Sequence, residues 1–147
     1  ALCQVAVAVF RCPAAAPVRL RESDKREAMT VESTNLTDLI NDQLTLAGQG
    51  ETSGRSARTL HGGKENALRQ TVVVMLGGHR MDEHVSPGEA TLLVLAGSLR
   101  IHTAERQLDA REGDFVVIPR ERHSVDALED SALLLTVIKP VGHGYNA

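Results

Sequence analysis

The sequence predicts a single all-β domain, a sandwich or barrel of short strands preceded by one helix. Three observations lead to this prediction: a length of 147 residues, an apolar content of 42%, and a series of short apolar runs separated by turn residues. This length is enough for one hydrophobic core and too short for two ordinary domains. Short strands at regular spacing are typical of a β-sandwich or β-barrel.

The strands are predicted from apolar runs that lie between Gly, Pro and acidic turn residues. They are expected at residues 57–61, 69–76, 91–96, 98–102, 114–118, 123–128 and 132–138. Runs such as TVVVML, TLLVLA and ALLLTVI are nearly continuous in apolar residues. We therefore expect these strands to be buried on both faces or to be covered by a partner subunit.

One amphipathic helix is predicted between Asn35 and Gly48. Asn35 is placed to cap its start and Gly48 to end it. The apolar residues between them recur at helical spacing: Leu36, Leu39, Ile40, Leu44 and Ala47. We expect this helix to brace the strands.

The chain divides into four parts by composition. Residues 1–28 are expected to be a disordered extension or upstream-translated sequence, because an ordinary protein start follows at Met29. Residues 29–56 hold the helix and a polar linker, residues 57–140 form the β-domain, and residues 141–147 form a tail.

Composition excludes several functions. The net charge is −3, aromatic residues make up 2% of the chain, and basic residues are scattered among acidic ones, which argues against nucleic-acid or membrane-surface binding. The two cysteines, Cys3 and Cys12, lie outside every periodic segment, so neither a disulfide framework nor a cysteine-type zinc site is expected. A cytoplasmic location is the prediction.

Two segments resemble the motifs of the cupin family. The segment GHRMDEHVSPGEATLLVLAG resembles the first motif, G-x5-H-x-H-x3-E-x6-G, with Gly78, His84 and Gly97 in place and with Ser86 and Ala90 at its second His and its Glu. The resemblance implies a small single-domain jelly-roll barrel with a short N-terminal helix.

The second segment, GDFVVIPRERHSVDA, resembles the motif G-x5-P-x-G-x2-H-x3-N. Gly113 and Pro119 match, whereas His123 comes one residue early, and Glu121 and Ala127 occupy the Gly and Asn positions. Gly97 suits a tight turn, and Pro119 is tolerated at the end of a strand.

The family resemblance implies a metal held by three histidines and a glutamate, of which only His84 and His123 remain. Serine is a poor ligand for a transition metal and alanine is none. Glu89 can replace the missing glutamate only if a bulge near Pro87 turns it inward. Further histidines that could complete a site are His79, His61 and His102, with His79 taken as the third candidate ligand.

Two functions are favoured, and the sequence neither supports nor excludes a third, a purely structural or regulatory role. In the first, the barrel binds a small, partly apolar organic molecule, and the candidate ligand contacts are His84, His123, Ser86, Arg80 and Arg122. The alternative is a metal-dependent enzyme of the dioxygenase or isomerase type that uses zinc, nickel, iron or manganese. The resemblance and the open strand edges also predict a homodimer, with residues 57–76 contributing to its interface.

Overall fold

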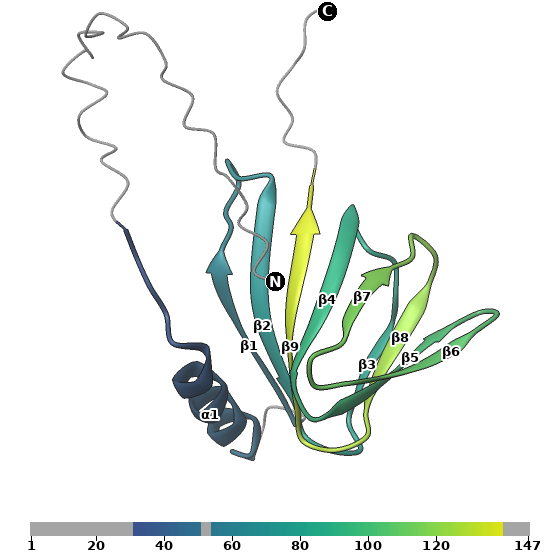
Figure 1. The fold of residues 1–147 in the computed structure, drawn as a ribbon, viewed down its shortest axis with the longest axis horizontal. Helices are drawn as coiled ribbons and strands as arrows, with labels where there is room; N and C mark the ends of the chain where they lie inside the picture. Colours follow the sequence, from purple (N-terminus) through teal and green to yellow (C-terminus); the bar gives the residue numbers. More distant parts are fainter. Residues whose placement is uncertain (1–30, 51–53, 140–147) are drawn as a thin grey trace, which may run out of the picture. The chain divides into compact units, whose positions relative to one another are not determined.

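The computed structural model describes residues 31–50 and 54–139, which form one helix and nine strands (Figure 1). The elements are α1 (Leu36–Ala47), β1 (Arg55–His61), β2 (Leu68–Met75), β3 (Arg80–His84), β4 (Glu89–Ala96), β5 (Ser98–Thr103), β6 (Gln107–Arg111), β7 (Phe115–Ile118), β8 (His123–Ala127) and β9 (Ser131–Ile138). The expectations for residues 1–28 and 141–147 lie outside the described residues.

The strands form two antiparallel sheets. One sheet has five strands in the order β1-β2-β9-β4-β7, and the other has four in the order β3-β8-β5-β6 (Figure 1). Non-consecutive neighbours such as β2 and β9 arise because the chain crosses repeatedly between the sheets. The all-β jelly-roll prediction is confirmed.

The faces that the sheets turn toward each other make the main core. Met75, Leu92, Leu99 and Leu133 are almost fully buried there, among aliphatic neighbours from β2, β4, β5 and β9. Each such side chain contributes about 1.5–3 kcal/mol through removal from water. The core is aliphatic, as the scarcity of aromatic residues requires.

Helix α1 covers part of the other face of the five-stranded sheet. The side-chain oxygen of Asn35 accepts a hydrogen bond from the backbone N–H of Asp38 at 3.1 Å, which confirms the predicted cap. Leu39 packs with Val72 and Val74 of β2, and Ser56 of β1 donates a hydrogen bond to Gln43. Residues 72–75 of β2 are therefore buried on both faces, as the apolar run there predicts, whereas the first half of the strand is more exposed.

Strand β7 leaves apolar side chains in the open. Phe115 and Val117 are 64% and 72% exposed, and Ile138 on β9 is 49% exposed. The outer face of residues 57–76, by contrast, is partly occupied by α1. The homodimer stays a prediction.

No helix among the described residues is both long and apolar enough to cross a membrane.

Two strands, β3 and β6, were not expected from the sequence. Their segments, RMDEH and QLDAR, are mostly polar and carry no clear alternation of apolar residues. They form because neighbouring strands offer backbone partners: β3 pairs with β8, and β6 pairs with β5. Backbone pairing with a neighbouring strand therefore outweighs the weak β-propensity of these two edge segments.

Gly97 provides a test of the turn between β4 and β5. It has φ of 74°, and a Cβ atom added there would lie 2.3 Å from the carbonyl oxygen of Asp130. We expect Gly97→Ala to lower the free energy of unfolding by at least about 3 kcal/mol, because backbone strain and a steric clash add together. Urea denaturation measures this change.

Gly113→Ala is the matched control. Gly113 also has positive φ, 90°, but a Cβ atom there would meet nothing within 4 Å. We expect Gly113→Ala to lower the free energy of unfolding by about 1–2 kcal/mol, from backbone strain alone. Equal costs for the two variants would contradict the proposed close approach at Gly97.

Candidate functional site

His84 and His123 come together on the inner side of the four-stranded sheet. Their residues are register partners in the pairing of β3 with β8, and their ring centroids lie 4.5 Å apart with a tilt of 59° between the planes. His123 is 4% exposed and His84 is half-buried. Thr103 of β5 pairs with His123 from the other side and extends this row.

A bulge in β3 makes this meeting happen. Met81 pairs with Val125 and His84 pairs with His123, so β3 has one more residue than β8 over this stretch. Met81 packs in the core. On a straight strand the alternation of faces would place Glu83 inward with Met81 and His84 outward. The extra residue reverses this and brings His84 to the inner face.

Hydrogen bonds fix the proton positions on both rings. Nδ1 of His84 lies 2.7 Å from the carbonyl oxygen of Asp82, and Nδ1 of His123 lies 2.9 Å from that of Glu121. A carbonyl oxygen can only accept a hydrogen bond, so each Nδ1 carries the proton and donates it. In the neutral ring, each Nε2 then keeps a lone pair.

Neither Nε2 atom has a hydrogen-bond partner among the described residues. Among the described side-chain nitrogens and oxygens, only Nε of Arg69 is both unpaired and fully sealed from solvent. The two Nε2 atoms are therefore unpaired but not fully sealed. The pair offers two hydrogen-bond acceptors, or two metal ligands, to anything that enters from this end of the sandwich.

The segments before the two histidines are tied together by an ion pair. Nε of Arg122 contacts the carboxylate of Glu83 on the exposed side of these strands. Each partner precedes one histidine in the chain. The ion pair therefore helps to hold β3 beside β8 where the rings meet, with Arg122 directed away from the pair.

A cavity of about 410 Å³ lies at this end of the sandwich, and neither His84 nor His123 is among its lining residues. Thr103 and Glu121, which flank His123 by strand pairing and by hydrogen bonding, both line it. Its other walls combine apolar residues, such as Ile101, Leu108 and Val116, with the charged Glu105 and Arg106. Most small-molecule sites combine such apolar walls with a few polar groups.

The structure places the other candidate residues elsewhere. The backbone carbonyl of His79 accepts a hydrogen bond from Ala127. Ala127 is four residues along β8 from His123, which is roughly 13 Å along the strand. Ser86 donates a hydrogen bond to the carbonyl of Gly88 and lines a separate cavity of about 520 Å³. Arg80 faces the outer side of the four-stranded sheet. These ligand roles stay predictions.

The remaining histidines and Glu89 also lie apart from the pair. His61 is exposed on β1, at the position paired with Gln70. His102 faces outward on β5, where it contacts Asp126. Glu89 forms an ion pair with Arg120 at 3.2 Å, and both side chains are largely exposed.

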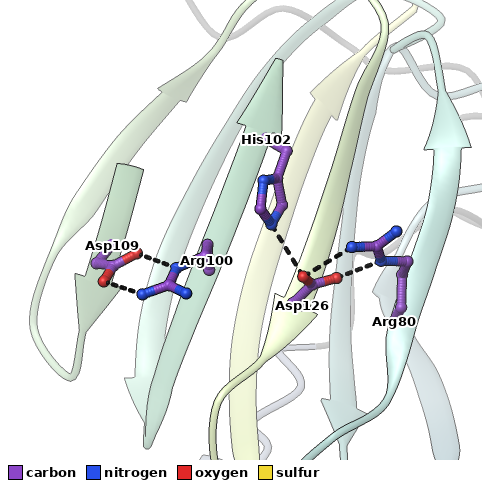
Figure 2. A network of polar contacts seen from close by, with 5 residues as sticks. All are labelled: Arg80, Arg100, His102, Asp109 and Asp126. Atoms are coloured by element: carbon purple, nitrogen blue, oxygen red, sulfur yellow. Dashed lines mark hydrogen bonds and ion pairs between the residues drawn. The ribbon is translucent and has the colours of Figure 1, made fainter. Parts of the chain in front are cut away.

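A ladder of charges crosses the outer face of the four-stranded sheet (Figure 2). Register places Arg80 beside Asp126, Asp126 beside Arg100, and Arg100 beside Asp109, so the sign alternates over four strands. Arg80 donates two hydrogen bonds to Asp126, and Nε2 of His102 lies 2.9 Å from the same carboxylate. The Arg80 guanidinium holds the pKa of Asp126 below its ordinary value, and His102 adds to the effect.

The described residues supply only part of a metal centre. Among them, no group of three or more His, Cys, Asp or Glu residues could hold a metal ion. Protein zinc sites use three or four protein ligands. The unpaired Nε2 atoms of His84 and His123 have the chemistry of metal ligands, and an ion bound by both would need water or an organic ligand for its other positions.

Sequence reasoning missed the contributions of Thr103, Asp82 and Glu121 to the site. Thr103 belongs to the row of the two histidines, and the carbonyls of Asp82 and Glu121 orient the rings. Register between distant strands brings Thr103 there, and no local pattern signals it. The backbone contacts follow from chain position, two residues before each histidine.

Comparisons with known proteins agree with this architecture. A family model described as "Cupin domain" matches residues 71–139. A conserved protein of unknown function from Streptococcus pyogenes is 31% identical, with coverage of 61% of this chain and 78% of that one and a TM-score of 0.55. Residues 71–139 of this chain therefore form a cupin domain. A search of curated proteins gives no match.

Two further solved structures share the fold. A cupin-2 domain containing protein from Shewanella frigidimarina is 21% identical, with coverage of 67% of this chain and 91% of that one and a TM-score of 0.52. Salicylate 1,2-dioxygenase from Pseudoaminobacter salicylatoxidans is 19% identical, with coverage of 70% of this chain and 31% of that one and a TM-score of 0.59. At these identities the likeness concerns the fold, which hosts many functions.

The proton positions on the two histidines can be tested directly. We expect neutral His84 and His123 to carry the proton on Nδ1, because each Nδ1 faces a carbonyl oxygen. Long-range proton–nitrogen NMR spectra of the imidazoles distinguish the two tautomers, and exposed His61 is the reference. A predominant Nε2-protonated form on both rings would contradict the assignment.

The charge ladder predicts a dependence of stability on pH. Since the folded-state pKa of Asp126 lies below its unfolded value, its stabilising effect is complete above about pH 4 and is lost as pH falls through the folded-state pKa. We expect Asp126→Asn to lower the free energy of unfolding by about 1 kcal/mol at neutral pH. The variant should also lose less of this free energy than wild type as the pH falls. Urea denaturation at several pH values measures both.

Asp109→Asn is the control for this prediction. Asp109 has one cationic partner, Arg100, and its side chain is 52% exposed, whereas Asp126 is 24% exposed and contacts both Arg80 and His102. The Asp109 variant is therefore expected to have the weaker effect. The explanation fails if both variants follow the same stability curve between neutral and acidic pH.

Proposed function

We propose that this cupin domain binds a small organic molecule at the end of the sandwich where His84 and His123 meet. The observation that carries the proposal is the pair of Nε2 atoms left without a partner among the described residues, because both Nδ1 atoms donate to backbone carbonyls. Groups that are fixed on strands but have no partner in the protein are suited to a ligand.

The neighbouring cavity supports this proposal. Its volume of about 410 Å³ lies within the range of small-molecule sites, roughly 300–1,000 Å³. Ile101, Leu108 and Val116 provide apolar contact, and Thr103, the strand partner of His123, lines the same cavity with its hydroxyl hydrogen-bonded to the backbone of Arg106. A partly apolar molecule with a polar group directed at the histidines fits these walls.

The alternative is a metal-dependent enzyme. The same Nε2 atoms are the ones that imidazoles use as metal ligands, with Nδ1–H held by a carbonyl oxygen behind each ring. The fold is shared with a dioxygenase, salicylate 1,2-dioxygenase. A zinc, nickel, iron or manganese ion held by His84 and His123 would supply Lewis-acid or redox chemistry.

Two protein ligands favour the binding function over the enzyme. A metal held by only two imidazoles keeps several positions open and exchanges readily, so it makes a weak centre. Neither proposal requires a nucleophile from the chain. The two differ in whether stoichiometric metal accompanies the native protein.

The proposal is tested by thermal-shift screening of small metabolites, with and without each of the four metals, on protein purified without a nickel column. Ligands that bind only the folded state must raise its stability, by about 2.7 kcal/mol at one hundred times the dissociation constant. We expect His84→Ala and His123→Ala to lower the affinity for the best ligand at least about tenfold, because each removes a polar contact between an imidazole and the ligand.

His61→Ala is the matched control, because His61 is exposed on β1 and lies apart from the pair. It should leave ligand affinity unchanged, and circular dichroism should show that all three variants fold. A ligand bound equally well by all three would refute the site. Stoichiometric metal that is lost in the His84 and His123 variants would instead support the enzyme.

A further inference from the structure

The interior of the sandwich changes character along its length. Near Gly97 the inward side chains are aliphatic, as at Met75, Leu99 and Ala127. At the opposite end, the inward positions of the four-stranded sheet are His84, His123 and Thr103. Polar groups collected at one end of an apolar interior are typical of a ligand site.

Arg69 belongs to this polar end. On β2 it alternates with Val73 and Met75, which face the core, so it lies on the inner face of the five-stranded sheet. It pairs with Val137, which pairs in turn with Ala90.

The connecting segments place this row at the same end of the sandwich as the histidines. Ala90 pairs with Val137 on one side and with Ile118 on the other. Residues 85–88 connect His84 to the start of β4, and residues 119–122 connect the end of β7 to His123. Arg69 and the two histidines therefore lie at the same end of the sandwich, on facing sheets.

The guanidinium of Arg69 is left without a counterion. Its Nη2 donates one hydrogen bond to the carbonyl of Gly63 at 3.0 Å, and no described carboxylate forms an ion pair with it. Its Nε is the one described side-chain nitrogen or oxygen that is both sealed from solvent and unpaired. A guanidinium has five N–H donors, so most of its capacity is unused.

The inner faces hold no compensating acid. The inward positions of the described strands include two arginines, Arg55 and Arg69, and no Asp or Glu. Arg55 donates to the carbonyl of Arg80 near the other end. The carboxylates closest to the cavity, Glu105 and Glu121, are in connecting segments and exposed to solvent.

We propose that the ligand of this site is a small organic acid whose carboxylate binds the guanidinium of Arg69. This proposal rests on the function proposed above and names the class of its ligand. A planar guanidinium matches a carboxylate geometrically and in charge, and partial removal from water strengthens the pair. The apolar part of the acid would lie against the aliphatic inner side chains near Val137 and Ile118.

The test compares hexanoate with hexanamide, which have the same chain length and differ in charge. Affinities are measured by isothermal titration calorimetry with the full chain, and the His84 and His123 imidazole signals are followed by NMR. We expect wild type to bind hexanoate at least about tenfold more tightly than hexanamide, because a charged hydrogen-bonded contact is gained. High salt should reduce this preference.

Arg69→Met should abolish the preference while binding of hexanamide persists, and Arg69→Lys should retain part of it. Arg58→Met is the matched control, because Arg58 is exposed and its partner Val72 packs under α1 on the outer face. Arg69→Met should also keep or raise the melting temperature, since it removes an unpaired buried donor. A purely structural Arg69 would instead make this variant less stable.

The outcomes separate this inference from the proposed function. If hexanamide binds and moves the imidazole signals but hexanoate binds no better, or if Arg69→Met keeps the preference, the acid-binding proposal is overturned and the site stands. If neither compound binds and neither histidine responds, both proposals are overturned together.

Discussion

The position of β8 between β3 and β5 is the constraint on which this structure depends. This strand supplies inward groups to the core and outward groups to solvent, and a slip of one residue would exchange them. On the outside, Asp126 lies between Arg80 and Arg100 in register and accepts hydrogen bonds from Arg80. On the inside, Val125 and Ala127 are buried. Charge pairing and apolar burial therefore select the same register.

The candidate site is a consequence of that register together with one irregularity. Strand β8 presents His123 on the inner face, and the bulge in β3 turns His84 toward it. The bulge leaves Glu83 free to contact Arg122 on the exposed side. Because of this one additional residue, the His84 imidazole faces the interior and the neighbouring Glu83 carboxylate faces the surface. Bulges near functional sites commonly redirect side chains in this way.

The polar end of the interior is compatible with stability because the opposite end is so well packed. Met75, Leu92, Leu99 and Leu133 form a continuous aliphatic core, and α1 seals Val72 and Val74 behind it. The sandwich can then hold two imidazoles and a guanidinium without a counterion where its strands end. Natural proteins often place such locally unfavourable groups at functional sites and compensate for them elsewhere.

The amino-acid sequence by itself determined the fold class, the helix with its Asn35 cap, and the strands with continuous apolar runs. These features depend on the types of residue at neighbouring positions in the chain, which the sequence gives directly. It also singled out His84 and His123. Only tertiary structure decided that β3 and β6 form, since their polar segments become strands through pairing. The bulge, the distance between the two rings and the place of Arg69 likewise depend on registers between residues far apart in the chain, which no local pattern encodes.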